Sequence, residues 1–439
     1  MYPELSAIAA AVQNLDPSVH GGVCGEWMAG VEGADHRDAR GIALIPARET
    51  GHLHRVQSDY LQLQRLGIRA VRETVGWRIA EPASGRYDFS RIRAMLAAAQ
   101  RAEVQILWTL VHYGLPDDLS IDDPRLIGRF ERFCRAFAHE AGAASAALAG
   151  GAPVSTPVNE IGFHAYALAH TGFIHRHRPE GDAATQARAG FGYQCRLVEL
   201  SIAGIHALRE VEPRALMMSA EPLINVAAAV DATPESIDRA NECSARQWPA
   251  MDLLTGLVEP GLGGTPAMID WVGLNYYHNS QWELDWQALL AWQPPDARRV
   301  SLDHQLEQAF VRNGRPLVLA ETSHLGAGRG PWLDEVTDAL CRAHARDLPM
   351  RGVCPYPALA RPDWQDQTRW LDSGIRDLPI DGHVHARLPR LAWSYAHAPS
   401  GVTSVVGRRA TIRRLRCGHG LAHVHCGRSS RPRRETYPS

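Results

Sequence analysis

The chain has 439 residues, of which 45% are hydrophobic and 21% charged, and its formal net charge is −2. This composition supports a full hydrophobic core, and the near-neutral charge predicts no general attraction to nucleic acid. All 46 residues counted as lysine or arginine are arginine, which excludes Schiff-base aldolases, pyridoxal phosphate enzymes and P-loop ATPases, because each needs a lysine.

Short apolar runs and helical apolar spacing alternate along the chain. A long loop is expected between the first strand and about residue 48. The runs predict strands at residues 20–27, 68–72, 104–112, 154–160, 215–220, 269–277, 316–322 and 352–356. The helical spacing predicts helices at residues 59–66, 90–102, 125–142, 193–212, 302–313 and 333–347.

Alternation of this kind predicts an α/β fold with a parallel sheet, and eight units favour a closed (β/α)8 TIM barrel. The alternative is an open doubly wound sheet, which would require a glycine-rich turn after its first strand. The glycine-rich stretch at residues 326–330 follows the seventh strand instead and lacks the full fingerprint. We therefore expect one barrel domain over residues 1–390.

The last part of the chain has a different composition. Residues 401–439 contain nine arginines and one glutamate, so they carry a charge of about +8 and leave about −10 on the remainder. Apolar periodicity is lost from about residue 391. We interpret residues 391–439 as a disordered, solvated arginine-rich tail, with a nucleic-acid-binding arm as the less favoured alternative.

The compartment is predicted from the N-terminus and the cysteines. The first five residues lack a basic region followed by a long apolar one, and no run is long enough to span a membrane. The eight cysteines form no CxxC pair, and Cys134, Cys195 and Cys354 fall in predicted strands or helices. We expect buried thiols in a cytoplasmic protein with no membrane partner.

Two predicted strands end in a glutamate. One is the apolar run Val318–Thr322, which carries Glu321, and the other is the run from Val154 to Glu160. In a parallel barrel such ends lie at the mouth where the chemistry is placed. A pair of carboxylates about 5 Å apart is the arrangement that a retaining glycosidase uses, so we expect this separation for Glu160 and Glu321.

Further motifs lie at the ends of other predicted strands. They are RETVGWRIAEP at residues 72–82, VHYGLP at 111–116, TPVNEI at 156–161, GLNYY at 273–277 and AETS at 320–323. Together they resemble the RFSxSWxRIxP, YHWDLP, TxNEP, GLNYY and TENG motifs of family 1 glycoside hydrolases. The resemblance covers about residues 21–364 and implies a β-glucosidase-like enzyme on a (β/α)8 barrel.

The resemblance also implies a role for individual residues. Glu160 would be the acid/base and Glu321 the nucleophile, while Asn159 would contact the sugar 2-hydroxyl. Arg72 would hold Glu321 ionised and Tyr277 would donate a hydrogen bond to it. His112 would bind ring hydroxyls, and Asn275 of the GLNYY motif would also face the substrate.

The chain departs from the family pattern in three places. The positions after strand eight that the family fills with tryptophan and Glu-Trp are Tyr356, Asp363 and Trp364 here. The strand-one glutamine has no clear match, and Glu26 is the nearest candidate. The proline after the acid/base glutamate is replaced by Ile161. These changes concern the preferred sugar more than the reaction.

Two residue clusters allow alternative interpretations. The histidines His164, His170, His175 and His177 follow strand four and are interpreted as a polar active-site loop in preference to a metal site. Trp282, Trp286 and Trp292 follow strand six and are equally compatible with helix core and with sugar-stacking walls.

The sequence thus predicts hydrolysis of β-glycosidic linkages with retention, acting on a β-glycoside or oligosaccharide. No cofactor, metal, nucleic acid or membrane is expected to take part. The alternative is a catalytically inactive sugar-binding barrel associated with polysaccharide or glycoconjugate metabolism.

Overall fold

The computed structural model describes residues 27–38, 40–149, 152–171, 173–174 and 181–375. The predicted arginine-rich tail, Glu26, His175 and His177 lie outside the described residues. In this described part of the chain, none of the helices combines the length and the hydropathy needed to cross a membrane.

The strands form two parallel groups. The first group pairs in chain order and comprises β1 (Met28–Gly30), β2 (Ala70–Thr74), β3 (Gln105–Val111), β4 (Val154–Val158) and β5 (Leu216–Met217). The second group comprises β6 (Glu221–Pro222), β8 (Val272–Asn275), β10 (Leu317–Thr322) and β11 (Met350–Pro355).

Two parallel bridges join these groups into a closed barrel. Met218 pairs with Trp271, so β5 and β6 act as the two halves of one strand, and Trp27 pairs with Val353 between β1 and β11. Among the described residues the barrel therefore has eight parallel strands in chain order. The predicted (β/α)8 fold is confirmed, and the open doubly wound sheet is wrong.

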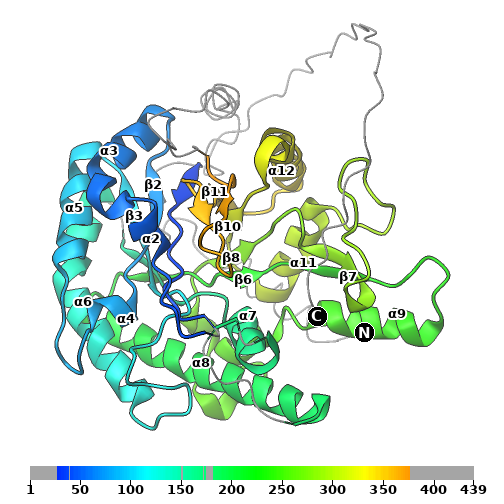
Figure 1. Cartoon of the computed structure of the whole chain (residues 1–439), viewed down its shortest axis with the longest axis horizontal. Coiled ribbons are helices and arrows are strands. Elements are labelled where there is room, and N and C mark those ends of the chain that lie inside the picture. Colours follow the sequence, from blue (N-terminus) through cyan, green and yellow to red (C-terminus); the bar gives the residue numbers. More distant parts are fainter. Residues whose placement is uncertain (1–26, 39, 150–151, 172, 175–180, 376–439) are drawn as a thin grey trace, which may run out of the picture. The chain divides into compact units, whose positions relative to one another are not determined.

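Helices surround the strands, as Figure 1 shows around the central arrows. The helices are α2 (Pro46–Glu49), α3 (His52–Arg65), α4 (Trp77–Ala80), α5 (Ser90–Ala102), α6 (Leu126–Ala149), α7 (Ile161–Tyr166), α8 (Ala183–Val211), α9 (Pro234–Ala245), α10 (Pro249–Leu254), α11 (Leu302–Asn313) and α12 (Arg329–Ala345). A π-helical turn at Ala167–Thr171 continues α7.

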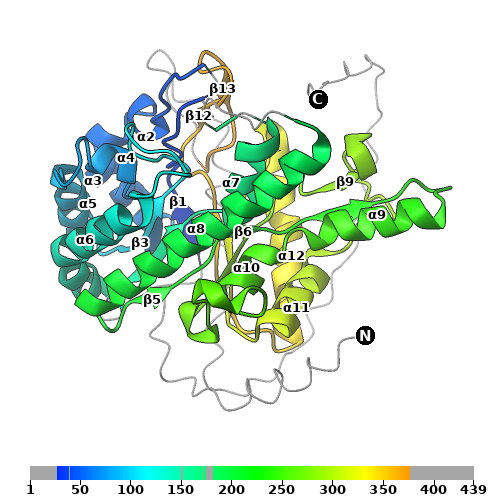
Figure 2. The same ribbon diagram turned by 90° about the horizontal axis from the view of Figure 1, so that it is seen from below.

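The remaining elements are short. Two antiparallel strands, β12 (Arg361–Pro362) and β13 (Trp370–Leu371), follow the last barrel strand. Two parallel strands, β7 (Asn225–Ala227) and β9 (Gln281–Glu283), pack with α9, which reaches beyond the helices of the barrel in Figure 2. Single 3-10 turns lie at Pro260–Leu262, Pro266–Met268, Leu284–Trp286 and Gly326–Gly328.

Several predicted boundaries need correction. Helix α3 begins seven residues before the predicted start at 59, and α6 ends seven residues after the predicted end at 142. The first strand is β1, which lies inside the stretch predicted as a long loop, and that stretch also contains α2. Residues 20–26 of the predicted strand lie outside the described residues. Helix α8 begins ten residues before the predicted start at 193, because Asp182 caps it by accepting the Thr185 amide at 2.8 Å.

The apolar side chains divide into two layers that follow the alternation of the strands. The inner layer fills the barrel with residues such as Met28, Leu107, Trp271 and Val318. The outer layer lies between the strands and the helices. Because the interior is packed below its carboxyl end, the polar side chains that enter the barrel collect at that end.

Candidate active site

Glu321 reaches the barrel interior because of an irregularity in β10. Val318 and Ala320 belong to the inner layer, so strict alternation would place Glu321 outside. The register of β10 shifts between Leu319 and Glu321, which is the signature of a β-bulge. A bulge turns the next side chain to the other face, and Glu321 consequently points inward, where it is 4% exposed.

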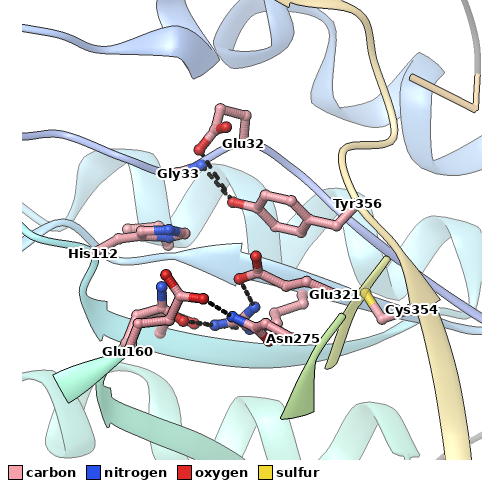
Figure 3. A network of polar contacts seen from close by, with 12 residues as sticks. Glu32, Gly33, His112, Glu160, Asn275, Glu321, Cys354 and Tyr356 are labelled. Atoms are coloured by element: carbon pink, nitrogen blue, oxygen red, sulfur yellow. Dashed lines mark hydrogen bonds and ion pairs between the residues drawn. The ribbon is translucent and has the colours of Figure 1, made fainter. Parts of the chain in front are cut away.

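Arg72 is the cation that connects the two glutamate-bearing strands. It enters the barrel from β2, is 2% exposed, and donates from one guanidinium nitrogen to Glu321. A second guanidinium nitrogen donates to Asn159 Oδ1, and Nε donates to Thr109 Oγ1 at 3.2 Å. This buried guanidinium therefore orients both the strand-seven carboxylate and the residue before Glu160 (Figure 3).

Glu160 follows β4 and has a left-handed backbone, with φ 45°. Asn275 Nδ2 donates to Glu160 Oε1 at 2.8 Å, and the Tyr113 hydroxyl donates to Glu160 Oε2. Asn275 is also the register partner of Glu321 on β10. The side chain that binds Glu160 thus stands beside Glu321, and both carboxylates belong to one site (Figure 3).

The two glutamates experience different electrostatic surroundings. Burial raises the pKa of Glu160 to about 7, and the negative charge of Glu321 adds to this rise. Burial also raises the pKa of Glu321, but the Arg72 guanidinium and the Tyr277 hydroxyl oppose the rise. The surroundings therefore favour the proton on Glu160 and the charge on Glu321.

Tyr277 and His112 complete the predicted set around the glutamates. The Tyr277 hydroxyl donates to Glu321 Oε2 at 2.7 Å. His112 is 2% exposed, and burial, reinforced by the Arg72 charge, lowers its pKa well below the usual value. His112 is therefore a neutral imidazole, which can donate to or accept from a hydroxyl group.

A third carboxylate, Glu32, was missed by the sequence analysis. It is 4% exposed and pairs with Arg361 at 2.8 Å, while the Tyr356 hydroxyl donates to it at 3.3 Å. Figure 3 shows Glu32, Tyr356 and His112 on the same side of the Glu160–Glu321 pair. The sequence signal is Val-Glu-Gly directly after β1, which a first strand predicted at residues 20–27 leaves in a loop.

Tyr113 was also missed as a site residue. It lies between His112 and Gly114 in the VHYGLP motif, and its φ of 75° turns the backbone after β3. Its hydroxyl contacts Glu160 and accepts from Asn159 Nδ2 at 3.2 Å. A positive φ is unusual for a bulky residue, and sequence spacing gives no sign of it.

The predicted residues after strand eight separate in space. The Trp364 ring lies edge-on to Tyr113, with 5.5 Å between centroids, so it stays near the site. The Asp363 carboxylate instead accepts a hydrogen bond from the backbone N–H of Gln365 at 2.8 Å, and it lies 3.8 Å from the Arg369 guanidinium. The structure therefore brings Trp364 toward the glutamates and turns the Asp363 carboxylate toward its own loop.

The two clusters with alternative interpretations occupy the elements after strands four and six. His164 is buried in α7, with its ring 5.4 Å from that of Tyr113. In the described part of the chain, no group of three histidine, cysteine or acidic side chains is arranged to hold a metal ion. Trp282 lies in β9 and Trp292 forms an isolated bridge with Pro295, so neither is part of a helix. Trp292 donates to His324 Nε2 at 3.1 Å.

Two small cavities border the site. One is lined by Glu32, Glu73 and Arg91 among others, and the second by Ser323, His324 and Arg329 among others. Each holds about 10 Å³, the space of a single water molecule. Neither is lined by Glu160 or Glu321, whose polar groups are occupied by their neighbours.

Comparisons with known proteins give a fold and no sequence family. No family model and no curated protein matches the chain. The AHE enzyme from Alicyclobacillus herbarius is similar in structure, with a TM-score of 0.66 and 17% identity over 89% of this chain and 98% of that one.

The family 1 β-glucosidase from Thermotoga maritima is also similar, with a TM-score of 0.64 and 14% identity over 84% of this chain and 96% of that one. The same enzyme in complex with deoxynojirimycin matches with a TM-score of 0.64 and 13% identity, over 84% of this chain and 96% of that one. The chain therefore has the fold of a TIM-barrel glycosidase.

Proposed function

We propose that this chain is a retaining β-glycosidase of the family 1 type, with Glu321 as nucleophile and Glu160 as acid/base. The observation that carries the proposal is the pair of glutamates at the ends of β4 and β10, with Arg72 bound to only one of them. Two carboxyl groups with opposed surroundings are what acid and nucleophile roles require.

The reaction would proceed in two steps. Glu321 attacks the anomeric carbon while Glu160 protonates the departing glycosidic oxygen, which leaves a covalent glycosyl-enzyme. Glu160, now ionised, then removes a proton from water, and the water displaces Glu321 from the sugar. Both displacements invert the anomeric centre, so the configuration is retained overall.

A panel of chromogenic aryl glycosides tests the proposal. We expect turnover of at least one β-glycoside, with the β-anomer as the first product detected by proton NMR. An initial α-anomer would indicate inversion, and the carboxyl groups would then be about 9 Å apart instead of about 5 Å. Binding of sugars without any turnover across the panel would favour the inactive sugar-binding barrel.

The pKa of Glu160 sets an expectation for the pH profile. The acid must be protonated to act, so kcat/KM is expected to fall as pH rises through about 7. Repeating the profile with a dinitrophenyl glycoside, whose leaving group departs without protonation, should flatten this basic limb. If kcat/KM fell by the same factor at the same pH with both kinds of substrate, a group other than Glu160 would be responsible for the basic limb.

Glu32 is proposed to accept hydrogen bonds from the hydroxyls of the bound sugar. We expect Glu32→Gln to lower kcat/KM by roughly 10–100-fold, because one hydrogen bond to a charged group is worth about 1.5–3 kcal/mol. Asp363→Asn is the matched comparison, since the Asp363 carboxylate contacts Gln365 and Arg369. A larger loss in Asp363→Asn than in Glu32→Gln would return the hydroxyl-binding role to Asp363.

A further inference from the structure

Another buried glutamate, Glu221, binds the two residues that follow Glu160 and has no part in the chemistry proposed above. Glu221 is the first residue of β6, the second half of the split fifth strand, and is 2% exposed. One of its carboxyl oxygens accepts the Ile161 amide at 2.7 Å, and the other accepts the Gly162 amide at 2.9 Å. These are the first two residues of α7, which begins immediately after Glu160.

The fifth strand also binds the backbone of Glu160. The amide of Glu160 itself donates to the Ala220 carbonyl at 2.7 Å. Three consecutive amides, from Glu160 to Gly162, are thus bound by Ala220 and Glu221. The left-handed φ of Glu160 is costly for a residue with a side chain, and these hydrogen bonds compensate for it.

The approach of Glu221 depends on the glycine at position 162. A Cβ atom at Gly162 would lie 3.2 Å from Glu221 Oε2, which is closer than ordinary van der Waals contact. The carboxyl group therefore fits against the start of α7 because this position has no side chain. An alanine at position 162 would require the Glu221 carboxyl group to move by a few tenths of an ångström.

Glu221 occupies the two backbone N–H groups that directly follow Glu160 in the chain. Backbone N–H groups that donate to a carboxylate stabilise its ionised form, whereas an acid catalyst must stay protonated until it transfers its proton. By accepting the Ile161 and Gly162 amides, Glu221 keeps these donors away from the Glu160 side chain. The Glu160 carboxyl is left to Asn275 and Tyr113.

We propose that Glu221 is a positioning residue that fixes the backbone of Glu160 and directs its carboxyl group toward the glycosidic oxygen. This inference rests on the proposed function, because it assigns Glu221 to the acid/base step. A residue with this role should matter most when protonation of the leaving group is difficult, and least when the leaving group departs unaided.

The charged and titratable groups around Glu160 come from several elements. They are Arg72 on β2, Tyr113 after β3, Glu321 on β10 and Glu221 itself. Burial raises the pKa of Glu221 to about 8, the two amides oppose this rise, and the charge of Glu160 adds to it. Because Glu221 is mostly neutral below about pH 8, its removal acts on Glu160 mainly by releasing the two amides, and free amide donors favour the ionised form of Glu160.

The first experiment compares Glu221→Gln and Glu221→Ala with wild type on aryl glycosides of graded leaving-group ability. We expect kcat to fall at least tenfold more for phenyl than for dinitrophenyl glycosides, as a damaged general acid requires. Glu81→Gln is the control for the loss of a buried carboxylate, because Glu81 accepts the Gly85 amide at 2.6 Å and also pairs with Arg129 at 3.0 Å. Equal losses on all substrates in the Glu221 variants, as expected for Glu81→Gln, would overturn the proposal.

The second experiment does not depend on turnover. Titration of carboxyl-labelled glutamates by carbon-13 NMR, with Glu160→Gln used for assignment, follows Glu160 directly. We expect the pKa of Glu160 to fall in Glu221→Gln, because the glutamine side chain keeps one acceptor oxygen for the two amides. The pKa should fall further in Glu221→Ala, which keeps none. An unchanged titration in both variants would overturn the positioning role. If the wild type hydrolyses no glycoside and the Glu160 titration still shifts in the two variants, the positioning role stands while the proposed function fails.

Discussion

Glu321→Gly is expected to abolish turnover of every glycoside, because no carboxylate remains to form the glycosyl-enzyme. The residue it removes is buried, bound by Arg72 and Tyr277, and turned inward by the bulge in β10. Steady-state hydrolysis of a dinitrophenyl glycoside measures the loss, which should reach the background rate. Azide added to this variant should give an α-glycosyl azide, since it attacks the β-glycoside in a single displacement.

Glu160→Ala is the complementary variant of the same prediction. With a dinitrophenyl leaving group the first step needs no proton, so a burst should be followed by accumulation of the glycosyl-enzyme. Azide should then restore turnover, because it needs no general base, and the product should be a β-glycosyl azide. A β-azide from Glu321→Gly together with an α-azide from Glu160→Ala would reverse the two roles.

Removal of Arg72 is expected to have the largest effect on stability. Arg72→Met leaves Glu321 buried without its cation, and breaking a buried pair in this way costs about 3–5 kcal/mol. Thermal unfolding measured at several pH values checks the loss. Arg93→Met is a suitable control, because Arg93 is 59% exposed in its pair with Glu140 and such pairs contribute about 0–1 kcal/mol.

The pH dependence of this variant has a definite sign. Arg72 opposes the rise in the pKa of Glu321 caused by burial, so Arg72→Met should raise that pKa further above its unfolded value. A carboxyl group with a raised folded pKa binds its proton more readily in the folded state, and stability then falls as pH rises. The deficit relative to wild type should therefore be larger at pH 8 than at pH 5, and an equal deficit at both would show that Arg72 acts through packing alone.

The same variant should alter the activity profile. Glu321 must be ionised to attack, so a higher pKa moves the acidic limb of kcat/KM to higher pH. The basic limb, which we assign to Glu160, should move less, because burial and the charge of Glu321 are the main causes of the raised pKa of Glu160. Movement of the two limbs by equal amounts would contradict the separate assignment of the acid and the nucleophile.

The sequence by itself determined the barrel and the identity of its central pair. Apolar runs alternating with helical spacing are a local property, so helices such as Ser90–Ala102 and Leu302–Asn313 were placed at their observed boundaries. Glu160 and Glu321 could be named because each ends a predicted strand, and Arg72 and Tyr277 because their motifs resemble those of family 1 glycoside hydrolases. In a closed parallel barrel those ends must converge.

Only the tertiary structure decided how the side chains at the barrel mouth are aimed. Nothing in the local pattern marks the bulge that turns Glu321 inward, since it arises from the pairing of β10 with β8 and β11. Glu32 lies just beyond the first predicted strand, and Glu221 lies just beyond the fifth. Local propensity places the ends of both strands too early. The partners of these two glutamates, Arg361 and the Ile161 amide, are remote in the chain. Such contacts form only after the barrel closes, so no spacing in the sequence could have assigned them.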